Sequence, residues 1–249
     1  MLKLIDANCR LGTGPVIREG SLKDTAQILE LMDDFNVEKA VVYHSAAMYS
    51  DPVLGNKLLL QETAGQPRFL RQWAVTPALW DLYPQPEEWV AQMLKNGVCS
   101  VRLFPAQYGH SLKRYAAGRL FDTLAAAGLP AFIAFDQIGS WDALYGLCTE
   151  DPANTFVLCS PGYRCLRWLV PIMDVCPNLY VETSNFFMHD GLTLFCKHMG
   201  ATRLLFGSGV PEASLAAAAS QLCLSDLAEE QKELIAFGNI TRLLAEVKQ

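Results

Sequence analysis

The first candidate for chemistry is the stretch DANCRLG at residues 6–12, which follows the first apolar run of the chain. Asn8 carries an amide that both donates and accepts hydrogen bonds, and Arg10 carries a planar guanidinium that binds carboxylates through two parallel hydrogen bonds. A second arginine, Arg102, lies in the apolar run VCSVRLF at 98–104. The two arginines predict a site for a small organic anion, a carboxylate or a phosphate.

Two further side chains have the chemistry of proton-transfer groups. His44 ends the apolar run KAVVYH at 39–44, and Glu182 lies in LYVETS at 179–184. Imidazole and carboxyl groups are common general acids and bases, and a nearby guanidinium stabilises negative charge that develops during a reaction. We therefore expect His44 and Glu182 to be catalytic and the arginines to hold the substrate.

A structural role is the alternative for each of these charged groups. The arginines could pair with Glu182 or Asp6 in a network at the mouth of the fold, because buried charges need partners. His44 could be a histidine at the edge of the core with no catalytic role. The residue types leave these alternatives open.

The remaining polar residues that follow apolar runs complete the expected substrate-binding set. This set is Asn8, Arg10, Arg102, His110, Ser160, Tyr163, Ser184 and Ser208. A divalent metal site rebuilt from His44, His110, His189 and Glu182 is conceivable, but the chain has neither an HxH nor an HExxH spacing to support it. We therefore expect no metal ligand and no cofactor.

The elements that would position these residues alternate between short β-rich runs and longer amphipathic runs. The expected strands cover residues 3–7, 39–44, 69–75, 98–104, 130–135, 155–159, 179–184 and 203–208. The expected helices cover residues 21–36, 53–65, 86–96, 115–128, 140–149, 164–175, 190–199 and 213–223, with a closing helix at 228–247. Eight βα units in 249 residues predict a single α/β domain over residues 1–249, closed as a (βα)8 TIM barrel with its active site at the C-terminal ends of the strands.

Composition and charge narrow the classes of partner. The net charge is −6, and the basic residues are scattered, so the chain lacks the basic patch that binds nucleic acid or an anionic membrane surface. The start MLKLIDANCR is too polar for a secretory signal, and no apolar stretch approaches a membrane span. We expect a cytoplasmic protein whose partner is a small anionic molecule, and the charged fraction of 18% is compatible with a homo-oligomer.

Several segments, in this order and spacing, resemble the amidohydrolase-related family of metal-dependent barrel hydrolases. They are LIDANCRLG, GVCSVRLFP, VLCSPGYR, PNLYVETS, RLLFGSGVP and GNITRLL. The resemblance covers nearly the whole chain. It implies the barrel fold and the cleavage of a small organic compound by hydrolysis or by breaking a C–C or C–O bond.

The resemblance also implies positions for metal ligands, and this chain departs from them. The two histidines of the first strand are Asn8 and Arg10 here, the histidine of the sixth strand is Ser160, and the aspartate of the eighth strand is Gly209. The histidine of the fifth strand has no counterpart near residues 134–136. We therefore expect a degenerate metal site. The alternative to an enzyme is a non-catalytic barrel that binds a small acid or a protein partner.

Overall fold

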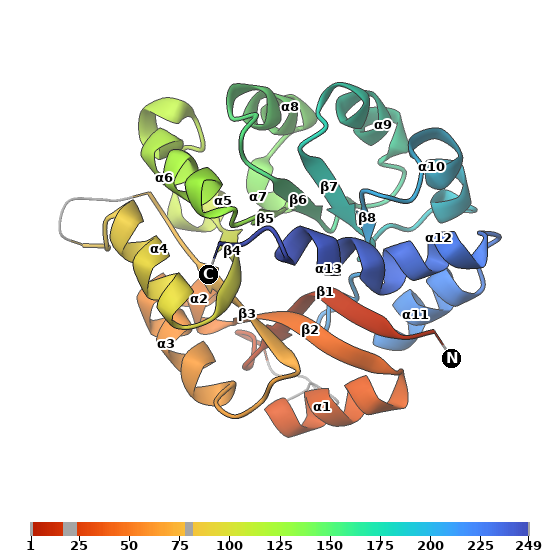
Figure 1. Ribbon diagram of the computed structural model, residues 1–249, viewed down its shortest axis with the longest axis horizontal. Helices are drawn as coiled ribbons and strands as arrows, with labels where there is room; N and C mark the ends of the chain where they lie inside the picture. Colours follow the sequence, from red (N-terminus) through yellow and green to blue (C-terminus); the bar gives the residue numbers. More distant parts are fainter. Residues whose placement is uncertain (1, 17–23, 78–81, 249) are drawn as a thin grey trace.

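The computed structural model describes residues 2–16, 24–77 and 82–248, and eight parallel strands form one sheet in the order β1 to β8 (Figure 1). The strands are β1 (Leu4–Leu11), β2 (Val37–His44), β3 (Phe69–Ala74), β4 (Val98–Leu103), β5 (Ala131–Ala134), β6 (Phe156–Cys159), β7 (Leu179–Glu182) and β8 (Leu204–Leu205). The sheet closes on itself because Ala7 N donates to Phe206 O and Arg10 N donates to Val210 O, both at 2.8 Å. The predicted TIM barrel is confirmed.

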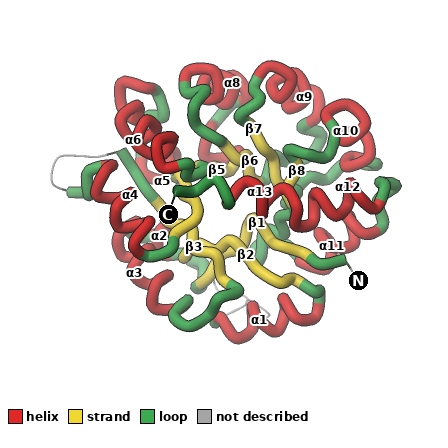
Figure 2. Tube along the Cα trace, viewed as in Figure 1, coloured by secondary structure: helices red, strands yellow, loops and turns green. Residues whose placement is uncertain are grey.

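Long helices form a ring around the strands (Figure 2). They are α1 (Thr25–Asp34), α3 (Pro52–Glu62), α4 (Pro86–Lys95), α6 (Arg114–Ala127), α8 (Trp141–Glu150), α9 (Leu166–Val175), α10 (Gly191–Met199) and α11 (Leu215–Cys223). Each matches a helix expected from the sequence, although the first three residues of the expected helix 21–36 lie outside the described residues. Among the described helices, none combines the length and apolar composition needed to cross a membrane.

Three short helices follow strands at the C-terminal end of the barrel and were not expected. They are α2 (Ala46–Tyr49), α5 (Pro105–Tyr108) and α7 (Phe135–Ile138). A helix of four residues makes only one turn, so it shows no apolar periodicity in the sequence. These helices nevertheless matter, because residues of all three border cavities described below.

The C-terminal segment closes the opposite end of the barrel (Figure 1). It consists of α12 (Glu229–Glu233), a π-helical turn η1 (Leu234–Gly238) and α13 (Asn239–Leu244), which together replace the single helix expected at 228–247. Ile240 and Leu243 of α13 pack with Ile5, Phe132 and Val157 inside the barrel. The expectation of a closing helix is confirmed, and the interior is a packed core.

The first and last strands differ from their predicted bounds. β1 continues to Leu11, which pairs with His44, so Asn8 and Arg10 lie within the strand and not after it as predicted. Asp and Asn are depleted in strands, and Asp6 and Asn8 interrupt the apolar run here, so the sequence pattern does not show that the strand continues. A register shift between Asp6 and Cys9 shows that this part of β1 is irregular. β8, expected at 203–208, is only two residues long.

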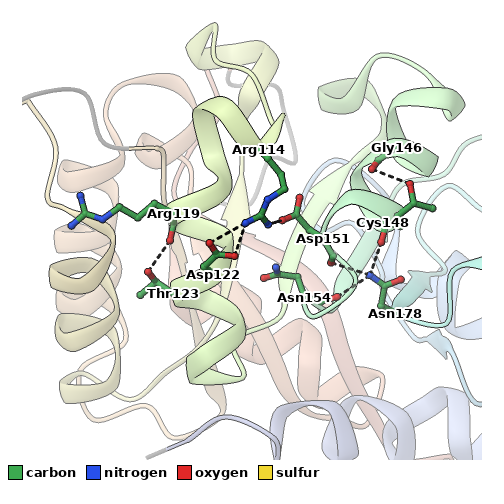
Figure 3. Close-up of polar contacts among 10 residues, drawn as sticks. Arg114, Arg119, Asp122, Thr123, Gly146, Cys148, Asp151, Asn154 and Asn178 are labelled. Atoms are coloured by element: carbon green, nitrogen blue, oxygen red, sulfur yellow. Dashed lines mark hydrogen bonds and ion pairs between the residues drawn. The ribbon is translucent and has the colours of Figure 1, made fainter.

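Polar side chains hold the connections that lead into β6 and β7 (Figure 3). Arg114 of α6 pairs with Asp122 on the same helix and with the buried Asp151 at the end of α8. The amide of Asn178 donates to backbone carbonyls of the 148–154 connection at 3.0–3.4 Å. These bonds fix the start of both strands, and the far ends of the same strands carry site residues.

Asn239 provides a test of how the closing segment is held. This fully buried amide donates to Ala201 O at 2.6 Å and to Leu204 O at 2.8 Å, so it ties α13 to β8. Asn239→Ala should lower the free energy of unfolding by about 2–3 kcal/mol, because both donors are lost inside the protein. Thr241→Ala, which removes an exposed hydroxyl from the same helix, should change it by less than about 0.5 kcal/mol in the same urea titration. Equal losses for the two variants would contradict this role.

Candidate functional site

A cavity of about 360 Å³ opens at the C-terminal ends of the strands. Its volume suits a compound with one substituted ring. The wall contains Asn8, Tyr43, Met48, Tyr49, Arg102, Phe104, Ala134, Asp136, Gln137, Ser160, Asn185, Gly209, Val210 and Glu212. These residues come from strand ends and from the loops and short helices that follow them, as expected for the active site of a TIM barrel.

The pleat of the strands decides which side chains reach this cavity. Ser100, Arg102 and Phe104 alternate with outward-facing Val101 and Leu103, which belong to the core between the sheet and the helices. The same alternation turns Tyr43 inward and places the rings of Tyr43 and Phe104 side by side, with centroids 5.6 Å apart. The two rings form an aromatic part of the cavity wall.

Arg102 is the cation in this wall. Its side chain is 3% exposed, and one terminal nitrogen donates to Asn8 Oδ1 at 3.2 Å and to Cys159 Sγ at 3.1 Å. The guanidinium carbon lies 5.0 Å from the centre of the Tyr43 ring, a distance typical of a cation–π contact. No carboxylate pairs directly with Arg102 among the described ion pairs, so its charge remains available to a ligand in the cavity.

Glu182 lies behind the wall and has no exposed surface. Its carboxylate accepts hydrogen bonds from Ser160 N at 2.6 Å, Ser184 N at 2.7 Å, Ser184 Oγ at 2.6 Å and Asn8 Nδ2 at 3.3 Å. Burial raises the pKa of Glu182 to about 7, against these hydrogen bonds, which lower it. A carboxyl group with a pKa near neutrality can both give and take a proton at physiological pH.

Two serine hydroxyls connect Glu182 to the cavity. Ser184 Oγ lies 2.6 Å from Glu182 Oε1 and 2.9 Å from Ser160 Oγ, and Ser160 lines the cavity. Asn8 bridges the other side of the network, since its Oδ1 accepts from Arg102 while its Nδ2 donates to Glu182 and Ser184. The structure thus brings together Asn8, Arg102, Ser160, Ser184 and Glu182, all of which the sequence analysis selected.

A glycine on the neighbouring strand end makes room for the buried carboxylate. A Cβ atom at Gly207 would lie 1.9 Å from Glu182 Oε2, far closer than van der Waals contact allows. Thr183 fastens the same glycine through hydrogen bonds between its Oγ1 and both the N and O atoms of Gly207, at 3.0 and 3.2 Å. Any side chain at position 207 would therefore displace Glu182.

A second buried carboxylate, Asp6, has a structural role. It accepts from Ser208 Oγ, from Ser208 N at 2.9 Å and from Asn8 N at 3.0 Å, and it lies outside the cavity wall. Burial raises the pKa of Asp6 to about 6. Ser208, expected to bind substrate, is 1% exposed and instead joins the end of the barrel to β1 through Asp6. The structure does not bring Ser208 to the cavity.

Arg10 is paired within the protein. Its guanidinium donates to Glu212 Oε1 and to Gly12 O, and Glu212, not Arg10, lines the cavity. The side chain of Arg10 is 5% exposed, whereas that of Glu212 is 56% exposed. The structural alternative thus applies to Arg10, although its partner is neither Asp6 nor Glu182.

His44 lies on the face of β2 opposite to Tyr43 and points toward the helices. Its Nε2 is 3.2 Å from Glu62 Oε1 of α3, and its Nδ1 accepts from Ala46 N at 3.0 Å. The structure therefore does not place His44 beside a ligand in the cavity. β2 is apolar on both faces, so its sequence gave no indication of which residues point inward.

The other loop residues of the expected set lie apart from the cavity. His110 borders a second cavity, and Tyr163 is 67% exposed and stacks on Arg164. His189, one of the residues considered for a rebuilt metal site, has a side chain that is 97% exposed. His44 contacts Glu62 outside the barrel, His110 borders another cavity and His189 is exposed, whereas Glu182 is fully buried, so the rebuilt metal site is not formed among the described residues.

The donor groups of the cavity do not suit a divalent metal. Within the described ranges, no three His, Cys, Asp or Glu side chains lie close enough to hold an ion. Asn8 Oδ1, an oxygen that could ligate a metal, already accepts from the Arg102 guanidinium, whose positive charge would repel a cation. Arg102 is the group of this wall that suits an anion, whereas Asp136 and Glu212 in the same wall are carboxylates.

The aromatic residues of the wall were not among the predicted site residues. Tyr43, Tyr49 and Phe104 have no acid–base or nucleophilic chemistry at neutral pH, so their residue types did not mark them as candidates. Gln137 was missed because it lies on the unexpected helix α7. Nothing in the apolar sequence of β2 could have found Tyr43, and only the structure shows that it shares the inward face of the strand with Val41.

Comparison with known proteins gives one family and one fold. A family model described as amidohydrolase matches residues 17–245. The search of curated proteins gives no match. Solved structures of similar fold include 2,6-dihydroxybenzoate decarboxylase from Rhizobium, with a TM-score of 0.75 and 17% identity over 98% of this chain and 99% of that chain.

Two more solved structures have the same fold. The 5-carboxyvanillate decarboxylase from Sphingomonas paucimobilis has a TM-score of 0.72 and 15% identity, and the whole of each chain is covered. A dihydroxybenzoic acid decarboxylase from a Polaromonas species, solved with bound manganese and the inhibitor 2-nitroresorcinol, has a TM-score of 0.73 and 17% identity. Its match covers 98% of this chain and 97% of that chain. At this identity the likeness concerns the fold alone.

The raised pKa of Glu182 predicts a pH-dependent stability. Between the ordinary glutamate pKa of 4.5 and the folded-state pKa of about 7, the folded state holds a proton that the unfolded state has lost, so stability falls as pH rises through this window. The loss amounts to about 3 kcal/mol. Urea titrations across the window should show Glu182→Gln gaining that amount relative to wild type, because glutamine does not titrate.

Asp6→Asn is the matched control for this measurement. The pKa of Asp6 in the folded state is about 6, so the difference in unfolding free energy between Asp6→Asn and wild type should change with pH only below that value and stay constant above it. Of these two variants, only Glu182→Gln should therefore show a difference from wild type that still grows between pH 6 and 7. A Glu182→Gln difference that stays constant from pH 4.5 to 7 would show that the carboxyl group is not held in its neutral form.

Proposed function

This chain belongs to the amidohydrolase family, and from that membership we propose that it cleaves a small hydroxylated aromatic carboxylic acid in the cavity at the C-terminal end of its barrel. The observation that carries the proposal is that one cavity has a cation in its wall, Arg102, and is connected through hydrogen bonds to a buried carboxyl group, Glu182. The first group binds an acid, and the second supplies a proton.

The wall of the cavity has the groups that such an acid requires. The guanidinium of Arg102 is the partner for the carboxylate, and the Tyr43 and Phe104 rings offer an aromatic surface for the ring of the substrate. The carboxylate of Asp136, also in the wall, repels a second anionic group but accepts a hydrogen bond from a hydroxyl. This combination favours a hydroxylated monocarboxylate.

Glu182 acts in this proposal as a general acid through the two serines. In its neutral form it donates to Ser184 Oγ across the 2.6 Å contact, and Ser184 donates to Ser160 Oγ across 2.9 Å. Ser160 gives its proton to the substrate while each hydroxyl receives one from the next group. Glu182 is left as a carboxylate, which its four hydrogen-bond donors stabilise.

The reaction that uses these groups without a co-reactant is decarboxylation. The proton binds the ring carbon that carries the carboxylate, the C–C bond to the carboxylate breaks, and its electron pair returns to the ring as carbon dioxide leaves. Glu182 then takes up one proton from water, so the cycle consumes one proton. The solved structures of similar fold named as decarboxylases of dihydroxybenzoate and carboxyvanillate support this choice over hydrolysis.

The family's metal has no role in this proposal. The positions that the family resemblance assigns to metal ligands carry Asn8, Arg10, Ser160 and Gly209, and the side chains present do not suit a cation. We therefore extend the proposal to a degenerate metal site in which Arg102 supplies the positive charge. No step above passes through a metal.

Binding of 2,6-dihydroxybenzoate tests the role of Arg102. Calorimetric titration should give an affinity that falls by about 100-fold in Arg102→Ala, because a charge-assisted hydrogen bond to the carboxylate is lost. Resorcinol, which has the same ring and hydroxyl groups but no carboxylate, should bind both proteins equally. Arg164→Ala, which removes an exposed arginine beside Tyr163, should bind the acid as wild type does. An unchanged affinity in Arg102→Ala would remove the arginine from the site.

Release of carbon dioxide from the same compound tests the proton donor. In wild type, kcat should be constant at low pH and fall above about pH 7, where Glu182 loses its proton. Glu182→Gln should lower kcat by about 100-fold or more with little change in KM, because Glu182 does not line the cavity. Ser184→Ala should also lower kcat, since it interrupts the hydroxyl chain.

Ser100→Ala is the control, because this buried serine lies inside the barrel, bonds Gln72 and is not part of the chain. It should keep the pH profile of wild type. Tight binding of the acid without any carbon dioxide release or other turnover would instead favour a non-catalytic barrel that binds a small acid.

A further inference from the structure

A second cavity, of about 320 Å³, lies beside the first at the C-terminal end of β4 and β5. Helices α5, α7 and α8 and the segment 109–113 surround it. Its wall is mostly apolar, with side chains that include Pro105, Leu112, Ile138 and Leu147. The proposed decarboxylation makes no use of this space.

His110 is the polar group that distinguishes this cavity from a simple apolar hollow. Both ring nitrogens are buried, and neither has a hydrogen-bond partner among the described residues. Burial lowers the pKa of His110 to about 4, so the imidazole is neutral at physiological pH and offers one N–H donor and one acceptor nitrogen. A buried polar atom without a partner costs about 1–3 kcal/mol, which a ligand that bonds it would recover.

The charge in the cavity excludes an anion as the preferred ligand. Lys113 lies in the wall, but its ammonium group is paired with Glu150. With a neutral imidazole and a neutralised lysine, the cavity has no free positive charge, in contrast to the first cavity with Arg102. An apolar wall with one donor and one acceptor matches a neutral ring compound with a hydroxyl group.

We propose that this second cavity is a binding site for a small neutral phenol or ring alcohol, whose ring fills the apolar space and whose hydroxyl bonds the His110 imidazole. The site is separate from the first cavity. Gln137 stands in the wall of both, and its Oε1 accepts from Gln107 N at 3.1 Å, which fixes the partition between α5 and α7. Gln137 is the one side chain that the described walls of the two cavities share.

Phenol and toluene are the probes, because they have nearly the same size and only phenol has a hydroxyl. Titrations of protein labelled with ¹⁵N-histidine should show the ring signals of His110 moving with phenol. Phenol should bind about 10-fold more tightly than toluene, which corresponds to about 1.4 kcal/mol. Equal affinities for the two probes, or phenol shifts that leave the His110 ring unmoved, would overturn the proposal.

Variants locate the site and its hydrogen bond. His110→Phe should abolish the preference for phenol, while His189→Phe, the same change at an exposed histidine, should keep it. Ala143→Phe, which places a ring in the cavity from α8, should abolish binding of both probes and covers the case in which His110→Phe does not fold. Arg102→Ala should keep the preference. If Arg102→Ala lost the preference for phenol, phenol would bind in the first cavity. If His110→Phe kept the preference, phenol would bind elsewhere than at His110, and either result would refute the site.

Discussion

The carboxyl group of Glu182 has no contact with solvent, and a buried carboxyl group needs hydrogen-bond partners that a single strand cannot provide. The barrel supplies them from three directions: the amide of Asn8 on β1, the backbone of Ser160 after β6, and the backbone and hydroxyl of Ser184 after β7. Gly207 leaves the space beside it. The positions of these strand ends relative to one another thus depend on satisfying one carboxyl group.

The hydrogen bonds that satisfy Glu182 also keep it from forming a direct ion pair with Arg102. Had Arg102 formed a direct ion pair with Glu182, the arginine would be neutralised and the pKa of the carboxyl group would fall. Asn8 stands between them, accepting from one and donating to the other. Arg102 therefore keeps its charge toward the cavity, and burial keeps the pKa of Glu182 near 7. A neutral bridging residue makes both an anion site and a proton donor possible within one network.

The short helices after the strands divide the space above the barrel. Residues of α2 border the first cavity, residues of α5 border the second, and α7 contributes to both through Gln137. A bond from the α5 backbone to Gln137 fixes this partition. The outcome is one cavity with a free cation and another with a neutral imidazole, so the two are suited to ligands of different charge.

The sequence alone determined the barrel, because alternating strand and helix patterns with suitable end signals leave few other ways to bury the core. It also identified Asn8, Arg102, Ser160, Ser184 and Glu182, whose polar groups interrupt apolar strand ends. Only the tertiary structure decided that His44 faces α3 and that Tyr43 faces the cavity, since β2 is apolar on both sides and shows no alternation. Likewise, only the structure paired Arg10 with Glu212, 202 residues away, because such a partner depends on closure of the barrel and leaves no local pattern in the sequence.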